Sequence, residues 1–537
     1  MSHPQLIVAL VVALLIAALS VAARRLRLAS PILMLLGGSV LAFQPDLPRV
    51  TVDPELVLLV LLPPLLYASG VGMSWRGFRS NLRPILLLAV GCVLFTAGIV
   101  ATAVHFLLGV SWPVGFVLGA IVSPPDAVAP MAVLRGIHLP RRLRTVLEGE
   151  SLVNDATALV TLSFALAAVG SARFSLAAAA LQFILIVCAE SVFGVLVGYA
   201  MLRLRHFVDD SRAEVLLAIA TPFIAFWPPH TAGGSGVIAC VAAGLYVSWN
   251  GRNLIRPATR LQGYFIWDLV VWAIEALLFL LAGLQAHVVV SSLAGDPWQR
   301  ALLAAALTCV LVIATRFAWV YVGTYLPYAL VSAERRASTM PDWRQPFFVA
   351  FTGLRGAVSL AAALLVPPLL DGEPFPDRDL VLVATYSVIV VTLVGLGGGL
   401  PATVRALGID RRGAAEAASN KLDEQRVRRE ALEAVLRAIP ADDPSGRSAT
   451  LFSRHQDRLR YYAQATERNE AAPAGPAGPA IDLTLLDIER SVVARAYEEH
   501  RLSDEARRRI ERELDLEESR LRHARASAGP GTGSDDA

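Results

Sequence analysis

The 537-residue chain is 55% hydrophobic and only 17% charged, and its mean hydropathy is +0.55. These values lie well away from those of soluble globular proteins and indicate an integral membrane protein. The formal net charge of +3 argues against the strongly basic surface that binds nucleic acid, so we expect no nucleic-acid partner.

The first apolar segment, Leu6–Ala23, is followed rather than preceded by arginines, Arg24 and Arg25. A secretory signal has the opposite order, so we expect this segment to remain as a membrane span. Apolar runs long enough to cross about 30 Å of hydrocarbon, some of them in broken form, recur along the chain. About thirteen are found, centred near Leu14, Leu36, Leu61, Val93, Val122, Leu159, Val187, Ile219, Val241, Leu278, Val310, Leu360 and Ile389. The sequence therefore predicts an all-α polytopic membrane protein.

Arginines alternate between the predicted loops. Nineteen fall in the loops on the side of Arg24, and only four, Arg49, Arg173, Arg300 and Arg378, fall on the other side. Basic loops are retained in the cytoplasm. The pattern predicts a multi-pass protein of the cytoplasmic membrane, with the N-terminus outside and the C-terminus in the cytoplasm. An error of one in the number of spans would destroy this alternation.

The composition changes after Pro401. Residues 414–439 and 481–523 show charged helical patterns with apolar positions, among them Leu422, Leu432, Leu436, Ile510, Leu514 and Leu521. An Ala/Pro/Gly linker at 471–480 separates them, and Gly529–Ala537 is expected to be disordered. We therefore expect a transmembrane domain at 1–410 and a cytoplasmic helical tail at 411–537. The tail is interpreted either as a regulatory or dimer-contacting domain or as a solvated amphipathic appendage.

Catalytic and metal-binding patterns are lacking from the sequence. The four cysteines lie in apolar runs without metal-ligand spacing and are interpreted as packed core residues. They are Cys92, Cys188, Cys240 and Cys309. Neither a phosphate-binding glycine loop nor a nucleophile elbow is found. We therefore expect neither an enzyme nor a bound cofactor.

Asp155 lies in an otherwise apolar span, where a carboxylate is costly and usually functional. On a helix Ser151 and Asp155 share a face because they are four residues apart, and Asn154 lies on the adjoining edge. Hydroxyl, amide and carboxylate oxygens are hard ligands that suit a small alkali cation. Burial favours the neutral carboxyl group, so the same site could hold a proton instead. The alternative interpretation is a cluster that makes interhelical hydrogen bonds.

A helix break is predicted one span earlier. Pro124 and Pro125 lie in the middle of the span Gly119–Leu134, where prolines remove helical donors and free backbone carbonyls. Asp126 can then lie at the N-terminus of the following half-helix. Arg355, between two glycines, occupies the corresponding span of a second six-span half. Inverted repeats with two discontinuous helices are the best sequence indication of a transporter's midplane site.

Two arginines, Arg316 and Arg355, fall within apolar spans, and each needs a partner because isolated buried charges are costly. We predict that Glu150 pairs with Arg355 in the core. Glu190 and Glu275 are interpreted as members of structural ion pairs more readily than as functional groups.

Four ordered motifs resemble the bacterial sodium/proton exchanger family, the monovalent cation:proton antiporters of the cation/proton antiporter-1 branch. They are Ser123-Pro-Pro-Asp-Ala-Val-Ala129, Glu148-Gly-Glu-Ser-Leu-Val-Asn-Asp155, the segment Trp272–Gln285 and Gly353-Leu-Arg-Gly-Ala-Val358. The resemblance covers roughly residues 5–410. It implies a homodimer with a dimerisation domain and a six-helix core that moves as an elevator.

The resemblance also implies roles for individual residues. Asp155 would be the carboxylate that binds the cation or the proton, with Asn154 as its structural neighbour and Ser151 as a ligand or near-ligand. Asp126 would be the acid at the helix crossing. The core ion pair would be Glu150 with Arg355. Sodium would bind at Asp155 and Ser151.

Two departures from the family pattern leave the transported cation open. Many relatives have Thr-Asp-Pro where this chain has Pro125-Asp126-Ala127, and some archaeal relatives have a glutamate at the position of Ala68. The expected function is exchange of Na⁺ or Li⁺ for H⁺, and the family associates an Asn before the binding Asp with electroneutral exchange. A K⁺/H⁺ antiporter and, from a different class, a cation channel remain the alternatives.

Overall fold

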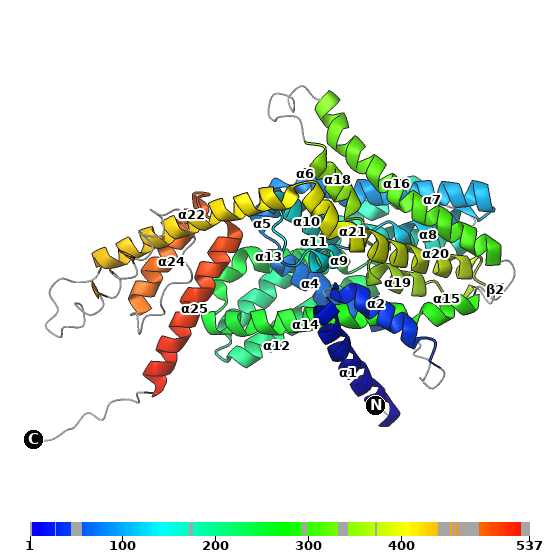
Figure 1. Cartoon of the computed structure of the whole chain (residues 1–537). Helices are drawn as coiled ribbons and strands as arrows, with labels where there is room; N and C mark the ends of the chain where they lie inside the picture. Colours follow the sequence, from blue (N-terminus) through cyan, green and yellow to red (C-terminus); the bar gives the residue numbers. More distant parts are fainter. Residues whose placement is uncertain are drawn as a thin grey trace, which may run out of the picture. The chain divides into compact units, whose positions relative to one another are not determined.

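The computed structural model describes residues 3–26, 28–44, 56–170, 176–292, 298–330, 342–370, 373–438, 452–453, 456, 459–460 and 483–527. These residues are almost entirely helical (Figure 1). The one β pairing among them joins β1 (Leu369–Leu370) to β2 (Glu373–Pro374) in antiparallel register. The predicted linker 471–480 and the predicted disordered end, Gly529–Ala537, lie outside the described residues.

The chain divides into two compact units. The first, here called the membrane unit, comprises Met1–Phe207, Leu216–Leu254 and Trp267–Asp410. The second, the tail unit, comprises Val208–Val215, Ile255–Ile266 and Arg411–Ala537. The tail unit thus includes two short segments that the sequence assigns to the transmembrane part.

The described helices up to residue 406 follow one another along the chain. In chain order they are α1 (His3–Leu26), α2 (Ser30–Leu41), the π-helix η1 (Val57–Leu61), α4 (Leu62–Gly72), α5 (Trp75–Ser80), α6 (Leu82–Leu86), the π-helix η2 (Leu87–Cys92), α7 (Val93–Leu108), α8 (Trp112–Val122), α9 (Val128–Val133), α10 (Arg141–Gly170), α11 (Leu176–Phe207), α12 (Ser211–Thr231), α13 (Val237–Leu254), α14 (Pro257–Leu284), α15 (Ala286–Ser292), α16 (Trp298–Leu330), α18 (Arg344–Phe351), α19 (Ala357–Leu364), α20 (Arg378–Val390), the π-helix η3 (Val391–Leu396) and α21 (Gly397–Ala406). Each of the thirteen predicted span centres lies in one of these helices.

Six helical stretches of the described chain are long and apolar enough to cross a membrane by themselves. They are Leu82–Leu108, Arg141–Gly170, Leu181–Phe207, Thr259–Ser291, Trp298–Pro327 and Arg378–Ala406. Shorter apolar helices lie between them. The structure therefore supports a polytopic membrane protein.

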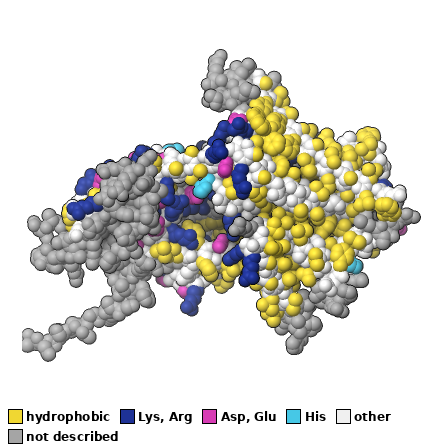
Figure 2. Space-filling view, viewed as in Figure 1, with side chains coloured by type: hydrophobic (Ala, Val, Ile, Leu, Met, Phe, Trp, Pro, Cys, Tyr) yellow, Lys and Arg dark blue, Asp and Glu magenta, His cyan; other side chains and the backbone are white. Residues whose placement is uncertain are grey.

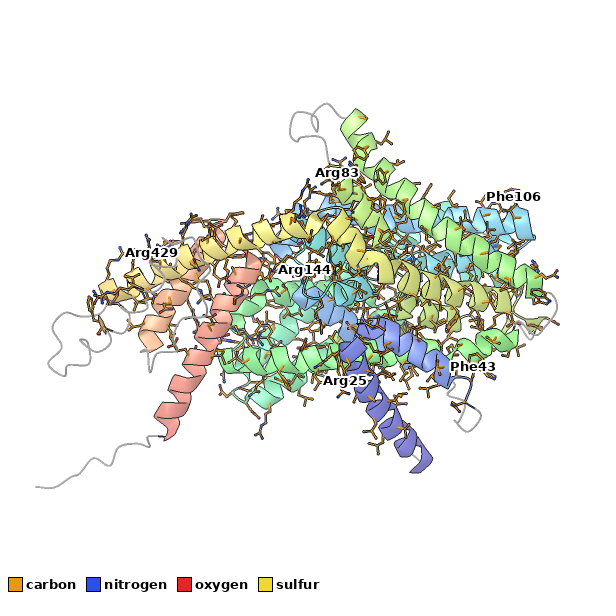
Figure 3. All side chains as sticks on the ribbon, viewed as in Figure 1. Arg25, Phe43, Arg83, Phe106, Arg144 and Arg429 are labelled. Atoms are coloured by element: carbon orange, nitrogen blue, oxygen red, sulfur yellow. The ribbon has the colours of Figure 1, made fainter. Side chains whose placement is uncertain are left out.

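The surface of the membrane unit suits a lipid solvent. Large apolar side chains such as Phe106, Leu185 and Val310 are exposed, and hydrophobic side chains cover much of this unit on the face drawn in Figure 2. In Figure 3, Arg25, Arg83 and Arg144 lie toward one end of the helices, whereas Phe43 and Phe106 lie toward the opposite end. Three arginine-rich loops of the sequence thus have a labelled arginine toward the same end.

Glycines allow some membrane helices to approach very closely. A Cβ on Gly38 of α2 would lie 3.0 Å from the Cα of Gly283 on α14, and one on Gly70 of α4 would lie 3.1 Å from the Cα of Gly244 on α13. In lipid, hydrophobic burial does not drive helices together, so close packing has to stabilise their association. Small residues allow this packing because they let two helix backbones approach each other. Apolar residues of α7, α8, α10, α16, α19 and α20 form one buried cluster.

Two membrane helices are discontinuous, at the positions that the sequence predicts. The first break separates α8 from α9, and the second separates α18 from α19. Pro124 and Pro125 lie in the first break, while Gly353 and Gly356 lie in the second, on either side of Arg355. Each break leaves several backbone groups without the regular helical partner.

The tail unit is built on α22 (Ile409–Ala438), α24 (Leu483–Glu498) and α25 (Asp504–Ser527). Its apolar core includes Val435, Leu486, Val493, Ile510 and Leu514. The predicted helical segment 481–523 is divided in two, because α24 ends at a turn in which His500 has a φ of 63°. The side chain of Leu521 lies outside the described residues.

Candidate ion-binding site

Two prolines cause the break between α8 and α9. Pro124 and Pro125 have no backbone N–H, so the carbonyls of Ala120 and Ile121 lose their helical donors. The hydroxyl of Ser123 donates to the Ala120 carbonyl at 3.1 Å and replaces one of the two missing bonds. The Ile121 carbonyl has no such replacement among the described residues.

The two breaks cross and bind each other through the backbone. The Asp126 N–H in the first break donates to the Leu354 carbonyl in the second at 2.8 Å. In return, Nε of Arg355 donates to the Val122 carbonyl at 2.7 Å, and its Nη1 donates to the Gly353 carbonyl at 3.1 Å. These bonds satisfy part of the irregular backbone within the protein, which is where such backbone is tolerated at membrane depth.

The structure corrects one predicted contact. Glu150 forms its ion pair with Arg316, not with Arg355, through two hydrogen bonds of 2.6 and 3.0 Å. Both side chains are buried, and Arg316 also donates to the Val349 carbonyl at 3.0 Å. The reason is geometric: Arg355 lies in a break whose free carbonyls accept from its Nε and Nη1, whereas Arg316 lies in the uninterrupted helix α16 and pairs with the carboxylate.

The polar face of α10 lies against the first break. The Ser151 hydroxyl accepts a hydrogen bond of 3.3 Å from the Ala127 N–H, and the Asn154 amide donates to the Pro125 carbonyl at 2.5 Å. The amide oxygen of Asn154 is buried without a partner among the described residues. The predicted clustering of Ser151, Asn154 and Asp155 on one face therefore positions all three beside unwound backbone.

Asp126 lies where the sequence places it, at the start of the half-helix α9. Its two carboxylate oxygens accept from the N–H groups of Val128 at 2.9 Å and Ala129 at 3.4 Å. The carboxylate packs directly on the second break, because a Cβ on Gly356 would lie 2.5 Å from Oδ2 of Asp126. This acid thus connects the two crossing segments.

A small cavity lies between α8, α10 and α19. Asp155 lines it together with Ile121, Pro124 and Ser359. Asp155 is half-buried and receives no hydrogen bond from the part of the chain that the structure describes. Among the described residues, the Asp155 carboxylate and the Asn154 amide oxygen are therefore the acceptors of this part of α10 that have no hydrogen-bond donor.

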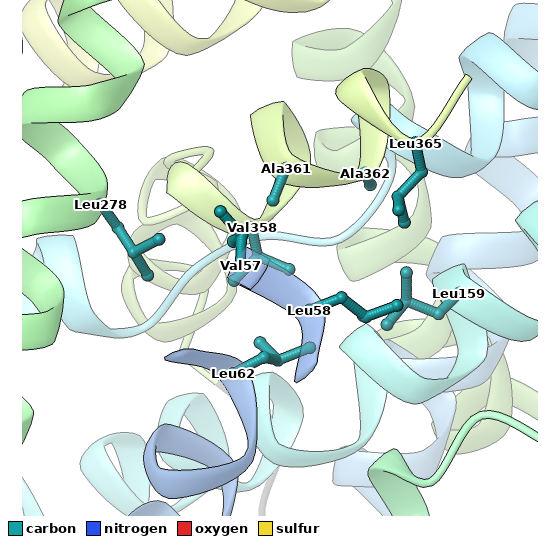
Figure 4. A pocket seen from close by; sticks show the side chains of 9 residues that line it. All are labelled: Val57, Leu58, Leu62, Leu159, Leu278, Val358, Ala361, Ala362 and Leu365. Carbon is teal, nitrogen blue, oxygen red and sulfur yellow. The ribbon is translucent and has the colours of Figure 1, made fainter. Parts of the chain in front are cut away.

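A second cavity shares three lining residues with the first, namely Leu159, Val358 and Ala362. Figure 4 shows aliphatic side chains from η1, α4, α10, α14 and α19 converging on it. They are Val57, Leu58, Leu62, Leu159, Leu278, Val358, Ala361, Ala362 and Leu365. An entirely aliphatic lining offers no ligand to a cation.

Glu190 is not part of this site. Its carboxylate accepts from the N–H groups of Ser235 at 2.6 Å and Gly236 at 3.0 Å, and from the Ser235 hydroxyl. These neutral donors directly precede α13. Glu190 therefore accepts hydrogen bonds at the start of a helix instead of forming the ion pair that the sequence predicts. Glu190 therefore has a structural role.

The site offers oxygen ligands and no thiol or imidazole. Among the described residues, no group of three His, Cys, Asp or Glu side chains could hold a metal ion. Carboxylate, hydroxyl and carbonyl oxygens suit a hard monovalent cation that passes through as cargo. The sequence prediction missed Ser359, which is among the residues around the same cavity as Asp155. It named Arg316 as a buried arginine but not as the partner of Glu150.

Comparison with known proteins identifies the chain's relatives. It is 34% identical over 529 residues to an uncharacterised Na(+)/H(+) exchanger of Mycobacterium tuberculosis, covering 96% of this chain and 95% of that protein. It is 31% identical over 372 residues to the sodium, potassium, lithium and rubidium/H(+) antiporter of Bacillus pumilus, covering 67% of this chain and 55% of that one.

A solved structure supports the fold. The sodium proton antiporter MjNhaP1 from Methanocaldococcus jannaschii, at pH 8, has a TM-score of 0.60 and 19% identity, covering 74% of this chain and 97% of that one. Residues 10–406 match the family described as sodium/hydrogen exchanger, transmembrane. The chain therefore belongs to the sodium/hydrogen exchanger family.

Proposed function

We propose that the protein exchanges Na⁺ for H⁺ and that Asp155 carries each of them in turn. The observation that supports this most directly is that Asp155, a half-buried acid of α10, is among the residues around a cavity beside the first break and receives no hydrogen bond in the described part of the chain. Ser151 and Asn154 hold the adjoining backbone in place. A single carboxylate cannot hold a proton and a cation together, so loading one ion requires release of the other.

The proposed movement is an elevator. The Asp155 carboxylate together with its bound ion has no net charge, whether the ion is H⁺ or Na⁺. The loaded site can therefore cross a low-dielectric barrier in both states. The aliphatic cavity in Figure 4 supports such a barrier, since α10 and α19 contribute one part of its lining and η1, α4 and α14 contribute the other. Aliphatic surfaces can slide past each other without breaking hydrogen bonds.

We also propose the number of membrane spans, their orientation and the oligomeric state. Thirteen spans in inverted repeats, an external N-terminus and a cytoplasmic tail at 411–537 follow from hydropathy and arginine placement. A homodimer follows from the resemblance to exchangers of this family.

K⁺/H⁺ exchange is the second candidate. The Bacillus pumilus relative is named for sodium, potassium, lithium and rubidium. This chain has Pro125 and Ala68 at the positions where the family resemblance leads us to expect a threonine in many members and a glutamate in some. A site with fewer fixed acidic or hydroxyl ligands discriminates less strictly between alkali cations.

The test is proton flux in reconstituted vesicles, started separately with Na⁺, Li⁺ and K⁺ and followed with a trapped pH indicator. Asp155→Asn should abolish cation-coupled flux, because an amide can neither release a proton nor neutralise a cation. Asp268→Asn, which changes an exposed acid of α14, is the matched control and should transport like the wild type. Coupled flux from a correctly folded Asp155→Asn protein would disprove the assignment, and conduction without proton coupling would indicate a channel.

A further inference from the structure

Thr392 is a polar residue of η3 without an assigned role, and its exposed fraction is 0%. Its hydroxyl donates to the Val388 carbonyl one turn earlier at 2.7 Å, as threonine hydroxyls in helices often do. A hydroxyl has a single proton, so its oxygen is left to act as an acceptor. It accepts from the backbone N–H of Arg355, in the second break, at 3.0 Å.

The Arg355 N–H depends on this oxygen. Arg355 lies between α18 and α19, outside the regular ladder of helical hydrogen bonds. No backbone carbonyl of the described chain accepts from its N–H. A buried backbone donor without an acceptor is costly. The hydroxyl of Thr392 therefore holds a piece of irregular backbone that no helix holds.

Arg355 connects this hydroxyl to the first break. Its Nε donates to the Val122 carbonyl at 2.7 Å, and the neighbouring Leu354 carbonyl accepts from the Asp126 N–H at 2.8 Å. Two hydrogen bonds thus join the first break to the short segment that Thr392 holds. A shift of this segment would move the partners of both bonds.

The first break in turn contacts α10 at the residues beside Asp155. The Pro125 carbonyl accepts from the Asn154 amide at 2.5 Å, and the Ala127 N–H donates to the Ser151 hydroxyl at 3.3 Å. Hydrogen bonds and the short stretches of backbone between them therefore form a continuous connection. It runs from η3 through the second break and the first break to α10.

We propose that Thr392 is a positioning residue for the ion site and that it acts through Arg355. The Thr392 hydroxyl holds the second break where it binds the first, and so sets the position of the backbone that Ser151 and Asn154 contact. Cation affinity then depends on Thr392, although Thr392 is not a ligand. This inference rests on the proposed function and extends it by naming a residue that maintains the geometry of the site.

The experiment compares Thr392→Val and Thr392→Ser with the wild type in reconstituted vesicles. Valine keeps the shape of the side chain but removes the acceptor of the Arg355 N–H, whereas serine retains the hydroxyl. The Na⁺ concentration at half-maximal proton flux should rise about tenfold in Thr392→Val, the size expected for the loss of one buried hydrogen bond. In Thr392→Ser it should return close to the wild-type value. Thr392→Ala, which also lacks the hydroxyl, should show the same rise and replaces the valine variant if that variant does not fold.

Thr385→Val is the matched control. Thr385 lies about two helical turns earlier, in α20, and is equally buried, but its hydroxyl has no hydrogen-bond partner among the described residues. Valine at this position removes a hydroxyl without breaking a bond, so the half-maximal Na⁺ concentration should stay at the wild-type value. Thermal stabilisation of the purified proteins by Na⁺ gives a readout without transport, and only the Thr392 variants without a hydroxyl should need more Na⁺ for the same stabilisation.

The outcomes separate the two proposals. If the Thr392 variants without a hydroxyl keep the wild-type half-maximal Na⁺ concentration, or lose only maximal rate or stability, the positioning role is overturned. It is also overturned if Thr392→Ser or Thr385→Val is as strongly impaired as Thr392→Val, because the bond to Arg355 is then not the cause. If the wild type shows no cation-coupled flux, or if Asp155→Asn retains it, the proposed function itself fails, and this inference fails with it.

Discussion

Glu150 and Arg316 depend on each other because both are fully buried. The pair is bidentate, at 2.6 and 3.0 Å, and lies next to the second break through the bond of Arg316 to the Val349 carbonyl. Arg316→Ala should lower the free energy of unfolding by about 3–5 kcal/mol, because it leaves an uncompensated carboxylate. Denaturation of the purified protein in detergent measures the change.

A double-mutant cycle tests the pairing itself. Glu150→Gln should recover part of the loss caused by Arg316→Ala, since the buried charge is then removed. The same rescue should fail for Arg355→Ala, because Arg355 is bonded to the carbonyls of Val122 and Gly353. Simply additive losses for Glu150 and Arg316 would contradict the pair that the structure shows.

Gly356 is the residue at which the two breaks are closest. Its φ of −106° and ψ of −173° are extended values that any residue can adopt, so the constraint is steric. A Cβ there would lie 2.5–2.7 Å from the carboxyl group and Cβ of Asp126. Gly356→Ala should therefore displace Asp126 at a cost of about 1–3 kcal/mol and reduce exchange strongly.

Gly398→Ala is the matched control for this prediction. A Cβ on Gly398 would meet no atom within 4 Å, and alanine is a better helix former than glycine. Exchange by this variant in vesicles should equal that of the wild type. Equal activity of the Gly356 and Gly398 variants would show that the contact at Asp126 does not matter for transport.

Residue spacing predicts only part of the site. Ser151 and Asp155 share a face because they are four residues apart, and two consecutive prolines must interrupt a helix, so both features follow from local chemistry. Ser359 could not be found in this way, since its approach to Asp155 depends on how α19 crosses α8. The partner of Glu150 was mispredicted because the sequence does not show that the carbonyls of Val122 and Gly353 accept from Arg355.

At the scale of elements, hydropathy locates the helices better than it locates their ends. Each predicted centre lies in a helix, yet the π-helices η1, η2 and η3 and the division of 481–523 into α24 and α25 were not foreseen. These details depend on packing and on single turns, such as that at His500. The two breaks were predicted correctly because proline and glycine act through the backbone itself.

Within the tail unit, α25 is bonded to the first turn of α14. The buried carboxylate of Asp515 accepts from Nε of Arg260 at 2.8 Å and from Nη2 of Arg490 at 2.9 Å. Arg260→Ala should therefore loosen α25 by about 1.5–3 kcal/mol, the typical contribution of hydrogen bonds to charged groups. Hydrogen exchange of α25 in the full-length protein measures this as faster exchange.

Arg429→Ala gives the comparison. Arg429 forms an exposed (i, i+4) pair with Glu433 at 3.2 Å, and such pairs contribute only about 0.3–0.5 kcal/mol. Exchange of the tail helices should hardly change in this variant. If Arg260→Ala has no larger effect than Arg429→Ala, the bond to Asp515 does not hold α25 in place.

For the whole molecule, composition and motif order sufficed to predict the membrane class and the family, and the comparisons confirm both. The number of spans, the orientation and the dimer stay predictions, because they depend on a bilayer and a second chain rather than on the folding of one chain. The division into 1–410 and 411–537 also stays a prediction, since Val208–Val215 and Ile255–Ile266 belong to the tail unit.

Charge balance is a property of the whole transport cycle. Asp155 is the carboxylate left without hydrogen bonds in the described part of the site, whereas both oxygens of Asp126 accept from backbone N–H groups. If Asp155 alone exchanges its ligand, one cation moves for one proton. The membrane potential, worth about 2.3 kcal/mol per charge at 100 mV, then contributes no driving force, and only the concentration gradients act.

We therefore expect electroneutral exchange. In vesicles whose potential is set with K⁺ and valinomycin, the Na⁺ and H⁺ gradients at which net flux stops should not change with the imposed voltage. Adding a proton ionophore provides the control, because proton flux through it must respond to the same voltages. A balance point that moves with voltage would show that more than one proton crosses per cation. Asp126 would then be the first acid to test, since it is the other carboxylate at the crossing of the two breaks.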